Sequence, residues 1–334
     1  MINKRIIAII LSFFATLVLL IYLFVWPDNA PKDSPEKFTV RLGWVHQTQF
    51  AGFYVAKDKG FYKKAGLDVT ILPLDLNKSQ TEELGDGLVE ASVMEAHQML
   101  GGIDVGNEIK AVAAIYQINP NVLAARADSG IKGPKDFTDK TIFGLAGGEG
   151  EGHAIFKVFI EQFGRVEGPK YVDLGFDAVD DFINKRADVI DIYRIDQPYL
   201  AQKKGVPLNI IPLDAYGLTT YGDVIAMNQK FIKTHPDTAR KFIQASLDGW
   251  RYALAHPEEA IDITLPYTSG QYHDVEYLRH IFTESIPLVQ GSEDNELGRM
   301  ELSSWSTLYE SMKSKNALTR SINVRDIFTN ELIQ

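Results

Sequence analysis

Apolar and polar residues alternate along positions 38–42, where the sequence reads FTVRL. A period of two is typical of a half-buried strand. Gly43 ends this run, and from Phe50 onward the apolar residues recur at helical spacing until Gly60, a common residue type after a helix end. The pattern therefore predicts a strand, a loop over residues 43–49, and a helix.

The same two periods alternate along the rest of the chain. Segments of helical period separate short apolar runs that are bounded by glycine, proline and polar residues. Such alternation is typical of parallel α/β sheets, so this fold class is expected. Beyond residue 227 the period is helical, and Thr234 is predicted to cap a helix with Pro236 in its first turn. The further predicted strands cover residues 67–74, 88–94, 109–115, 140–145, 188–193, 209–213 and 224–227.

Side chains that can stack on a ring or hydrogen-bond to it follow several of these strands. In open α/β sheets small molecules bind beyond the carboxyl ends of the strands, so these side chains are candidate ligand contacts. Phe50, Phe53 and Phe61, in contrast, are predicted to pack in the core. The candidates are Trp44, His46, Gln49 and Tyr54 after the first strand; Glu95, Gln117, Tyr193 and Asp196 after later strands; and Tyr216 and Tyr221 before the last strand.

A glycine-rich turn over residues 146–153 contributes Gly148 and Gly150 as two more candidates. Free backbone N–H groups at the start of a helix can bind an anion. The spacing is not G-x-G-x-x-G, and Glu149 and Glu151 would repel a pyrophosphate. A nucleotide is therefore not expected, and both a ligand contact and a plain tight turn stay open.

The N-terminus predicts membrane attachment. Lys4 and Arg5 precede residues 6–26, which carry no charge and would form a helix about 31 Å long, enough to span the hydrocarbon core. The positive end should stay in the cytoplasm, so the remainder of the chain is expected to be exported. Residues 1–26 are thus predicted to be an uncleaved anchor, with a cleaved signal peptide as the alternative, and residues 27–37 a tether.

Composition excludes several classes of function. A length of 334 residues with 45% hydrophobic residues suggests two domains or lobes. The net charge of -10 argues against nucleic-acid binding. The sequence has no cysteine, no histidine pair with metal-binding spacing and no G-x-S-x-G motif. No catalytic residue, metal or cofactor is therefore expected, and the chain is not predicted to be an enzyme.

Four segments carry a resemblance to a known family. They read GWVHQTQFAGFYVAKDKGFYKKAGLDVTI, YGLTTYGDVIAMN, GWRYALAHPEEAIDI and GRMELSSWSTLYESM. The chain resembles, over residues 38–331, the thiamine-pyrimidine precursor binding proteins and the eukaryotic thiamine pyrimidine synthases. The resemblance implies a two-lobed periplasmic-binding-protein fold, type II-like, with two crossovers and hinges near Arg126 and Asp223. The implied lobe I covers residues 38–125 and 224–334, and lobe II covers residues 126–223.

The resemblance also implies roles for individual residues. An aromatic sandwich around a pyrimidine ring is expected in the cleft between the lobes, because a flat heteroaromatic ring favours offset stacking on tryptophan and tyrosine. Trp44 matches the stacking tryptophan, and Gln49 lies in the segment that lines the cleft. Tyr193 and Asp196 match positions after the strand of the second lobe, and Tyr216 and Tyr221 match the cleft-facing tyrosines of the returning crossover. Gly148 and Gly150 lie in the turn that holds a phosphate in the synthases.

This sequence departs from the synthase branch of the family. The synthases carry a cysteine-rich segment and a lysine that holds pyridoxal phosphate, whereas this chain has no cysteine and places Met94 where the lysine would be. Without an amine no Schiff base can form, so synthase activity is not expected.

The expected function is therefore that of a binding protein. The chain should be a monomeric, membrane-anchored solute-binding protein at the bacterial inner membrane, with its bulk on the periplasmic or extracellular side. It would deliver hydroxymethylpyrimidine, formyl-aminopyrimidine or a similar small heterocycle to an ABC permease. The alternative is a ligand-sensing module that partners a histidine kinase or a diguanylate cyclase.

Overall fold

A computed structural model of the chain describes residues 34–146, 153–164, 166–175, 178–218, 220–292 and 296–333. The chain divides into two units, Met1–Glu36 and Lys37–Gln334. The predicted anchor over residues 6–26 lies outside the described residues. Within the described part of the chain, every helix is too short or too polar to cross a membrane.

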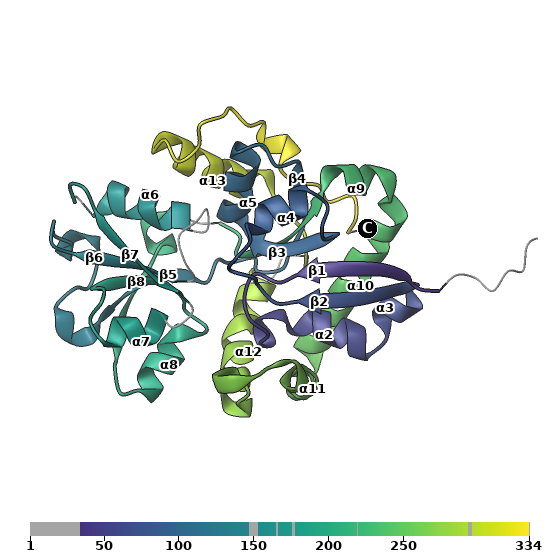
Figure 1. Cartoon of the computed structure of the whole chain (residues 1–334), viewed down its shortest axis with the longest axis horizontal. Helices are drawn as coiled ribbons and strands as arrows, with labels where there is room; N and C mark the ends of the chain where they lie inside the picture. Colours follow the sequence, from purple (N-terminus) through teal and green to yellow (C-terminus); the bar gives the residue numbers. More distant parts are fainter. Residues whose placement is uncertain are drawn as a thin grey trace, which may run out of the picture. The chain divides into compact units, whose positions relative to one another are not determined.

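The first sheet is the centre of lobe I and has the strand order β2-β1-β3-β10-β4. β1 runs parallel to β3, whereas β10 runs antiparallel to both β3 and β4 (Figure 1). The sheet is therefore mixed: the predicted α/β class is confirmed, but the predicted parallel arrangement holds only for part of the sheet. The strands are β1 (Glu36–Arg41), β2 (Leu67–Leu72), β3 (Ala91–Glu95), β4 (Ile109–Ala114) and β10 (Asp223–Asn228).

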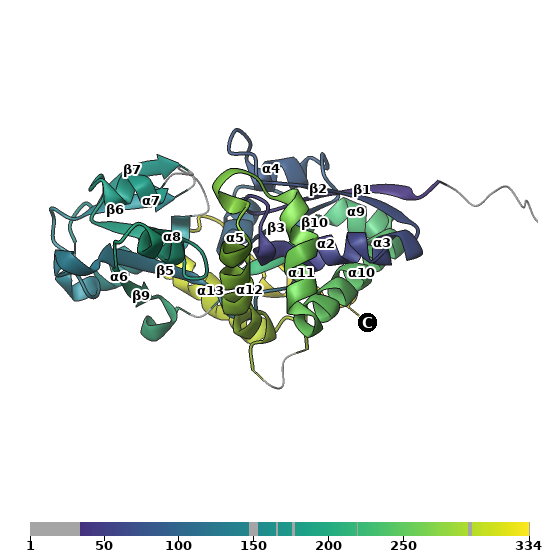
Figure 2. The ribbon, with the colours of Figure 1, turned by 90° about the horizontal axis from the view of Figure 1, so that it is seen from below.

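Period-two alternation in β1 assigns its side chains to the two faces of this sheet. Phe38 and Val40 join a core formed with helices α2, α3, α10, α11 and α12, which lie on the near side of the sheet in Figure 2. Arg41 points to the opposite face, where its guanidinium binds both carboxylate oxygens of Glu83 in α4 at 2.8 and 2.6 Å. The helices are α2 (Ala51–Asp58), α3 (Phe61–Lys64), α4 (Gln80–Gly85), α10 (Pro236–Ala255), α11 (Pro257–Thr264) and α12 (Val275–Gln290).

Helix α2 packs very closely on helix α10. Gly52 and Gly249 lie at the contact, where a Cβ on Gly52 would overlap the Trp250 ring and a Cβ on Gly249 would overlap the Gly52 carbonyl oxygen. The missing side chains let the two backbones approach. This contact holds α2, and with it the preceding loop over residues 43–50, against the body of lobe I.

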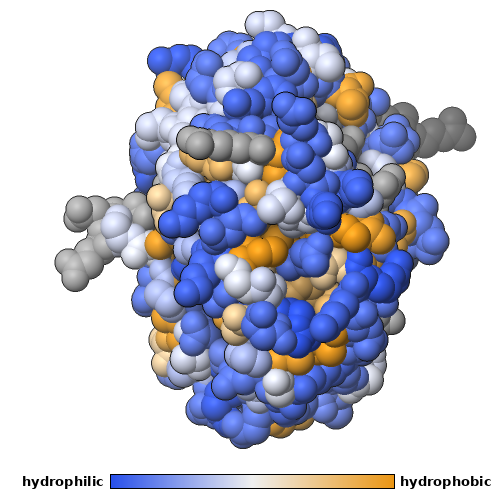
Figure 3. All heavy atoms as spheres, turned by 90° about the vertical axis from the view of Figure 1, so that its left-hand side faces the viewer, coloured by the Kyte–Doolittle hydropathy of each residue, from blue (hydrophilic) through white to orange (hydrophobic). Residues whose placement is uncertain are grey.

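The second sheet is the centre of lobe II and has the strand order β7-β6-β8-β5-β9. Helix α6 packs on one face, and α7 lies on the other with α8 beside it (Figure 1). The strands are β5 (Asn121–Arg126), β6 (Ile142–Ala146), β7 (Lys170–Gly175), β8 (Val189–Tyr193) and β9 (Leu208–Pro212). The helices are α6 (Ala154–Phe163), α7 (Ala178–Ile183) and α8 (Gln197–Lys203). The end of lobe II seen in Figure 3 is mainly hydrophilic, with apolar side chains in scattered patches.

The two-lobed α/β architecture that the sequence predicted is confirmed, with differences in detail. The chain leaves the first sheet after Ala114 and enters the second at Asn121. It therefore crosses between the lobes before β5, whereas the predicted hinge near Arg126 lies at the end of β5. It returns between Pro212 and Asp223. Strands β5 and β7 were not predicted at all.

The predicted cap at Thr234 was wrong. Thr234 is the last residue of α9 (Gln229–Thr234), and its hydroxyl donates to the Lys230 carbonyl oxygen one turn earlier. His235 is the N-cap of α10, which has Pro236 at its first position. The remaining long helices of lobe I, α5 (Ala96–Asp104) and α13 (Leu302–Ser314), pack in the core on the α4 side of the first sheet.

Candidate functional site

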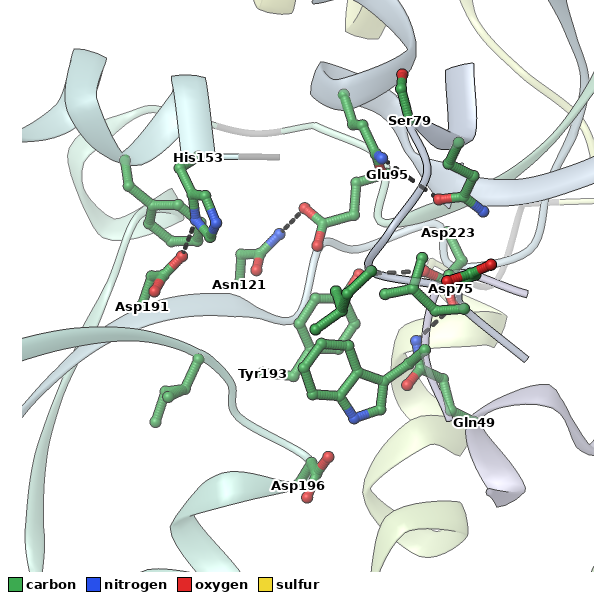
Figure 4. Close-up of a pocket in the computed structure, with 18 of the residues that line it drawn as sticks. Gln49, Asp75, Ser79, Glu95, Asn121, His153, Asp191, Tyr193, Asp196 and Asp223 are labelled. Carbon is green, nitrogen blue, oxygen red and sulfur yellow. Dashed lines mark hydrogen bonds and ion pairs between the residues drawn. The ribbon is translucent and has the colours of Figure 1, made fainter. Parts of the chain in front are cut away.

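A cavity of about 470 Å³ lies where strand ends of the two sheets meet. Lobe I and lobe II both contribute to its wall, and Figure 4 shows their polar side chains around it. This volume falls in the range of small-molecule pockets. The lining from lobe I comprises Gly43, Trp44, Gln49, residues 74–80, Glu82, Glu95, Gln98 and Asp223; that from lobe II comprises Asn121, His153, Phe156, residues 191–193, Asp196 and Gln197.

Strand direction explains why these residues meet. Trp44, Glu95 and Tyr193 follow or end β1, β3 and β8 at their carboxyl ends. Asp223 and Asn121 begin β10 and β5, which run antiparallel to their neighbours, so their amino ends reach the same edge. The cavity is therefore built from carboxyl ends of some strands and amino ends of others.

Two cross-strand pairs face each other across the cavity. Glu95 is the register partner of Asp223 in lobe I, and Asn121 is the register partner of Tyr193 in lobe II. The Asn121 side-chain amide donates a hydrogen bond to Glu95, and the Tyr193 hydroxyl donates to Asp223 Oδ1 at 3.1 Å (Figure 4). The two lobes are thus joined at the cavity by hydrogen bonds from neutral donors to carboxyl groups.

Burial changes the acidity of these carboxyl groups. It raises the pKa of Glu95 to about 7, against the hydrogen bond from Asn121, which favours the charged form. Burial likewise raises the pKa of Asp223 to about 7, and the nearby charge of Glu95 adds to the rise, although Gln49 donates to Asp223 Oδ2 at 2.8 Å. Both groups therefore titrate near neutral pH.

Asp196 is a third buried carboxyl in the wall. It accepts a hydrogen bond from the hydroxyl of Tyr277 in α12, which makes another contact between the lobes. Burial raises the pKa of Asp196 to about 6, while Tyr277 and Gln47 favour its charged form. Gln47 also donates to Gln49 at 2.6 Å, so the loop before α2 is linked to two of the wall carboxyls.

The remaining wall combines a histidine–aspartate contact with aromatic side chains. His153, the N-cap of α6, lies with Nδ1 2.5 Å from Asp191 Oδ2 in β8. Trp44 is half-buried, and its backbone carbonyl accepts a hydrogen bond from Leu74 N–H at 3.0 Å. This bond links the tryptophan to residues 74–80, which form another part of the lobe I wall. Among the described residues no group of three or more histidine, cysteine or acidic side chains could hold a metal ion.

The cavity brings together five of the predicted ligand contacts and leaves five others elsewhere. Those that line it are Trp44, Gln49, Glu95, Tyr193 and Asp196. His46, Tyr54, Gln117, Tyr216 and Tyr221 are outside its lining. Gly148 and Gly150 lie outside the described residues.

The five predicted contacts outside the lining are buried, hydrogen-bonded or exposed elsewhere in the two lobes. Tyr54 is fully buried, and its hydroxyl lies 2.9 Å from His46 Nδ1. Gln117 donates to two backbone carbonyl oxygens and lines a second cavity, of about 240 Å³. Tyr216 is 39% exposed, and buried Tyr221 accepts from Glu301 N–H at 2.7 Å.

The sequence analysis missed several wall residues. Asp223 was considered only as a hinge, and Asn121 was not among the candidates, because both begin a strand rather than follow one. His153 and Asp191 were noted in a glycine-rich turn and in a strand, yet nothing in their spacing indicated that they would pair. Residues 74–80, of which only residue 74 fell in a predicted strand, were not among the candidates, although they form much of the lobe I wall.

The sequence profile of the family described as NMT1/THI5 like matches residues 47–260. The chain belongs to this family. The predicted resemblance is thereby confirmed, and the matched residues include Gln49, Glu95, Tyr193 and Asp223 of the wall.

Two curated relatives match almost the whole chain. The riboflavin-binding protein RibY of Chloroflexus aurantiacus is 26% identical over 314 residues, which cover 91% of this chain and 88% of that protein. The formylaminopyrimidine-binding protein of Halalkalibacterium halodurans is 21% identical over 325 residues, which cover 94% and 96%.

The fold of this NMT1/THI5-like protein also matches a solved structure. The periplasmic aliphatic sulphonate binding protein SsuA of Escherichia coli superposes with a TM-score of 0.66 at 12% identity, covering 88% of this chain and 92% of that one. At this identity the likeness establishes the fold alone. The predicted two-lobed periplasmic-binding-protein fold is confirmed.

Proposed function

We propose that this chain is an exported solute-binding protein that binds a thiamine pyrimidine precursor, or a similar flat nitrogen heterocycle, and delivers it to an ABC importer. The observation that carries the proposal is the cavity of about 470 Å³ between the two lobes, with Trp44 and Tyr193 in its wall. An aromatic ring pair contributes about 0.5–1.5 kcal/mol beyond the burial of its area, so these side chains suit a flat ring.

The polar part of the wall supports the same ligand class. A heterocycle with amino groups and ring nitrogens needs a few fixed hydrogen-bonding groups at its edge. Gln49, Glu95 and Asp223 supply such groups, and each already holds a hydrogen bond that fixes its orientation. The relatives named for riboflavin and formylaminopyrimidine binding are consistent with this class.

Closure of the lobes would be the signal that a permease reads. The hydrogen bonds that Asn121 and Tyr193 make to lobe I cross the cavity, so a ligand held there would contact both sides at once. In this proposal residues 6–26 are an uncleaved anchor that keeps the binding lobes on the outer face of the membrane. Accessibility of the lobes to protease in intact cells or spheroplasts, together with N-terminal sequencing of the membrane-bound protein, tests this part.

A synthase-type activity is not part of the proposal. Met94 of β3 occupies the position that the resemblance assigns to the cofactor lysine, and its side chain is buried in the core. Among the described lining residues, Lys78 is the one lysine, and it lies at a different position from Met94. Its Nζ lies 3.5 Å from an Asp75 oxygen and 3.8 Å from a Glu83 oxygen.

Thermal unfolding of the full chain in detergent tests the proposed function. The compounds to compare are hydroxymethylpyrimidine, formylaminopyrimidine, riboflavin, thiamine and an aliphatic sulfonate. A ligand at roughly 1,000 times its dissociation constant adds about 4 kcal/mol of stability and should raise the midpoint by several degrees. A shift with a heterocycle is expected, whereas a shift with the sulfonate alone would rule the heterocycle out.

A further inference from the structure

The wall of the cavity is strongly acidic. Its described lining contains six carboxyl groups, and three of them, Asp191, Asp196 and Asp223, are at most 4% exposed. The carboxyl groups are Asp75, Glu82, Glu95, Asp191, Asp196 and Asp223. The carboxyl groups therefore lie inside the wall itself and are not confined to its solvent-exposed rim.

The basic side chains of the described lining do not match these carboxyl groups in number. Lys78 is exposed and lies near Asp75 and Glu83, and His153 is paired with Asp191. The described lining includes no arginine, although bidentate arginine contacts are the usual means of binding phosphate or carboxylate groups. An anionic ligand would therefore meet the wall without a matching cation.

We propose that the cavity selects a positively charged heterocycle, and that Glu95 and Asp223 together form its counter-ion. The inference rests on the proposed function, since it names the charge of the ligand that this cavity takes. A protonated amine or ring nitrogen would donate to both carboxylates, while Trp44 contacts the ring.

The geometry leaves room for these bonds. Glu95 and Asp223 are cross-strand partners, so their side chains lie side by side at the edge of the first sheet. An ionised carboxylate offers about four acceptor sites. Glu95 accepts a hydrogen bond from Asn121 across the cavity, its Oε2 lies 3.2 Å from His97 Nδ1 in its own lobe, and Tyr193 also favours its charged form. Asp223 accepts from Gln49 and Tyr193, so both carboxylates retain acceptor capacity.

A cation bound to this pair would also offset the energetic cost of the two buried charges. Both carboxyls have pKa values near 7 without a ligand, because burial disfavours their charged forms. A positive group between them would favour the doubly ionised pair. Binding of a cationic ligand would thus release protons to the solvent near neutral pH.

A series of three compounds on one ring tests the inference. Each is 4-amino-2-methylpyrimidine, carrying at carbon 5 an aminomethyl group (a cation), a hydroxymethyl group (neutral) or a phosphooxymethyl group (an anion). Affinities are measured by calorimetry on the full chain at about pH 7.5, above the pKa of about 7 of both carboxyls. The cation is expected to bind at least about tenfold more tightly than the neutral compound, and the anion at least about a hundredfold more weakly, because charge-assisted hydrogen bonds are roughly twice as strong as neutral ones.

Two isosteric variants locate the effect. Glu95→Gln and Asp223→Asn keep acceptors for their lobe II donors but remove one charge each, so each should reduce the ratio of cation to neutral-compound affinity about tenfold. Glu310→Gln, on the exposed face of α13, is the matched control and should change neither affinity. The wild-type series decides the inference even if one variant fails to fold.

The outcomes separate this inference from the proposed function. Equal or tighter binding of the neutral compound would overturn the charge selection and leave the heterocycle-binding protein in place. Binding of the anion above the other two would overturn it as well. Binding of none of the three would overturn the pyrimidine ligand itself, and the selection of a cationic pyrimidine with it.

Discussion

Glu95 and Asp223 are register partners across strands β3 and β10, and each accepts a hydrogen bond from the opposite lobe. Their donors, Asn121 and Tyr193, are register partners too, across β5 and β8. Two strand pairs thus meet end to end with complementary side chains. The contact between the lobes and the protonation of this carboxyl pair are therefore coupled.

The first prediction concerns the pH dependence of stability. Glu95 and Asp223 have pKa values of about 7 in the folded chain, against about 4 in the unfolded chain. Between about pH 4 and 7 the folded state holds more protons, so the free energy of unfolding should fall as the pH rises through this window. Each group contributes up to about 1.4 kcal/mol per pH unit. Urea unfolding of the ligand-free chain at several pH values measures the slope.

Variants show whether these two groups cause the slope. Glu95→Gln and Asp223→Asn should each flatten it, whereas Glu310→Gln should leave it unchanged. Carboxyls with lowered pKa values, such as Asp274 beside Lys203, act in the opposite sense but below about pH 4. A stability that rises between pH 5 and pH 7 would contradict the assignment.

The second prediction concerns the contact between the lobes. Tyr193→Phe keeps the ring in the wall but removes the hydroxyl that donates to Asp223 at 3.1 Å. The free energy of unfolding should fall by about 0.5–1.5 kcal/mol, the net value of a typical hydrogen bond. Chemical denaturation at about pH 8 provides the measurement.

An exposed contact between the lobes serves as the control for this prediction. Lys203 Nζ in α8 lies 2.8 Å from Asp274 Oδ2 at the start of α12, and both side chains are more than a third exposed. Solvent screening makes such pairs weak, so Lys203→Ala should cost less than Tyr193→Phe, and close to nothing at high salt. The reverse order would place the main tie between the lobes at the surface.

The sequence predicted those parts of the site that depend on local pattern. The segment from β1 to α2 combines a clear period of two with a clear helical period, and Trp44 and Gln49 lie in the cavity wall as expected. The composition of α2 does not show which of its side chains face the cavity and which face the core. Tyr54 has the same chemistry as Tyr193, but α2 buries it, and its ring stacks on Tyr267 at a centroid distance of 4.4 Å.

The parts that were missed depend on topology. Strand β5 shows no alternation because both of its faces are buried, with Val122 and Ala124 in one core and Leu123 in the other. No local signal gives the direction of β5 or β10, because direction is set by how the chain crosses between the sheets. Asp223 and Asn121 were therefore not recognised as wall residues.

The third prediction concerns the close contact between α2 and α10. Gly52→Ala should lower the free energy of unfolding by about 3 kcal/mol or prevent folding, because the added methyl group would overlap the buried Trp250 ring. Gly85→Ala is the control, since its methyl group would meet the Asn107 side chain at 3.1–3.3 Å, a contact that a small shift relieves, and alanine favours the helix. Similar costs for both variants, measured by thermal unfolding, would argue against a special role for the α2–α10 contact.

The last prediction concerns Trp44, the tryptophan in the cavity wall. Trp44→Ala should weaken binding of the ligand found in the thermal series more than tenfold, because stacking and the burial of a large ring are lost together. The variant should stay folded, because Trp44 is only half-buried, with an unfolding free energy within about 2 kcal/mol of the parent. Phe61→Ala is the matched control, since Phe61 is another half-buried aromatic residue of lobe I but lies outside the lining. Calorimetric titration of both variants compares them, and equal affinities for the two would remove Trp44 from the site.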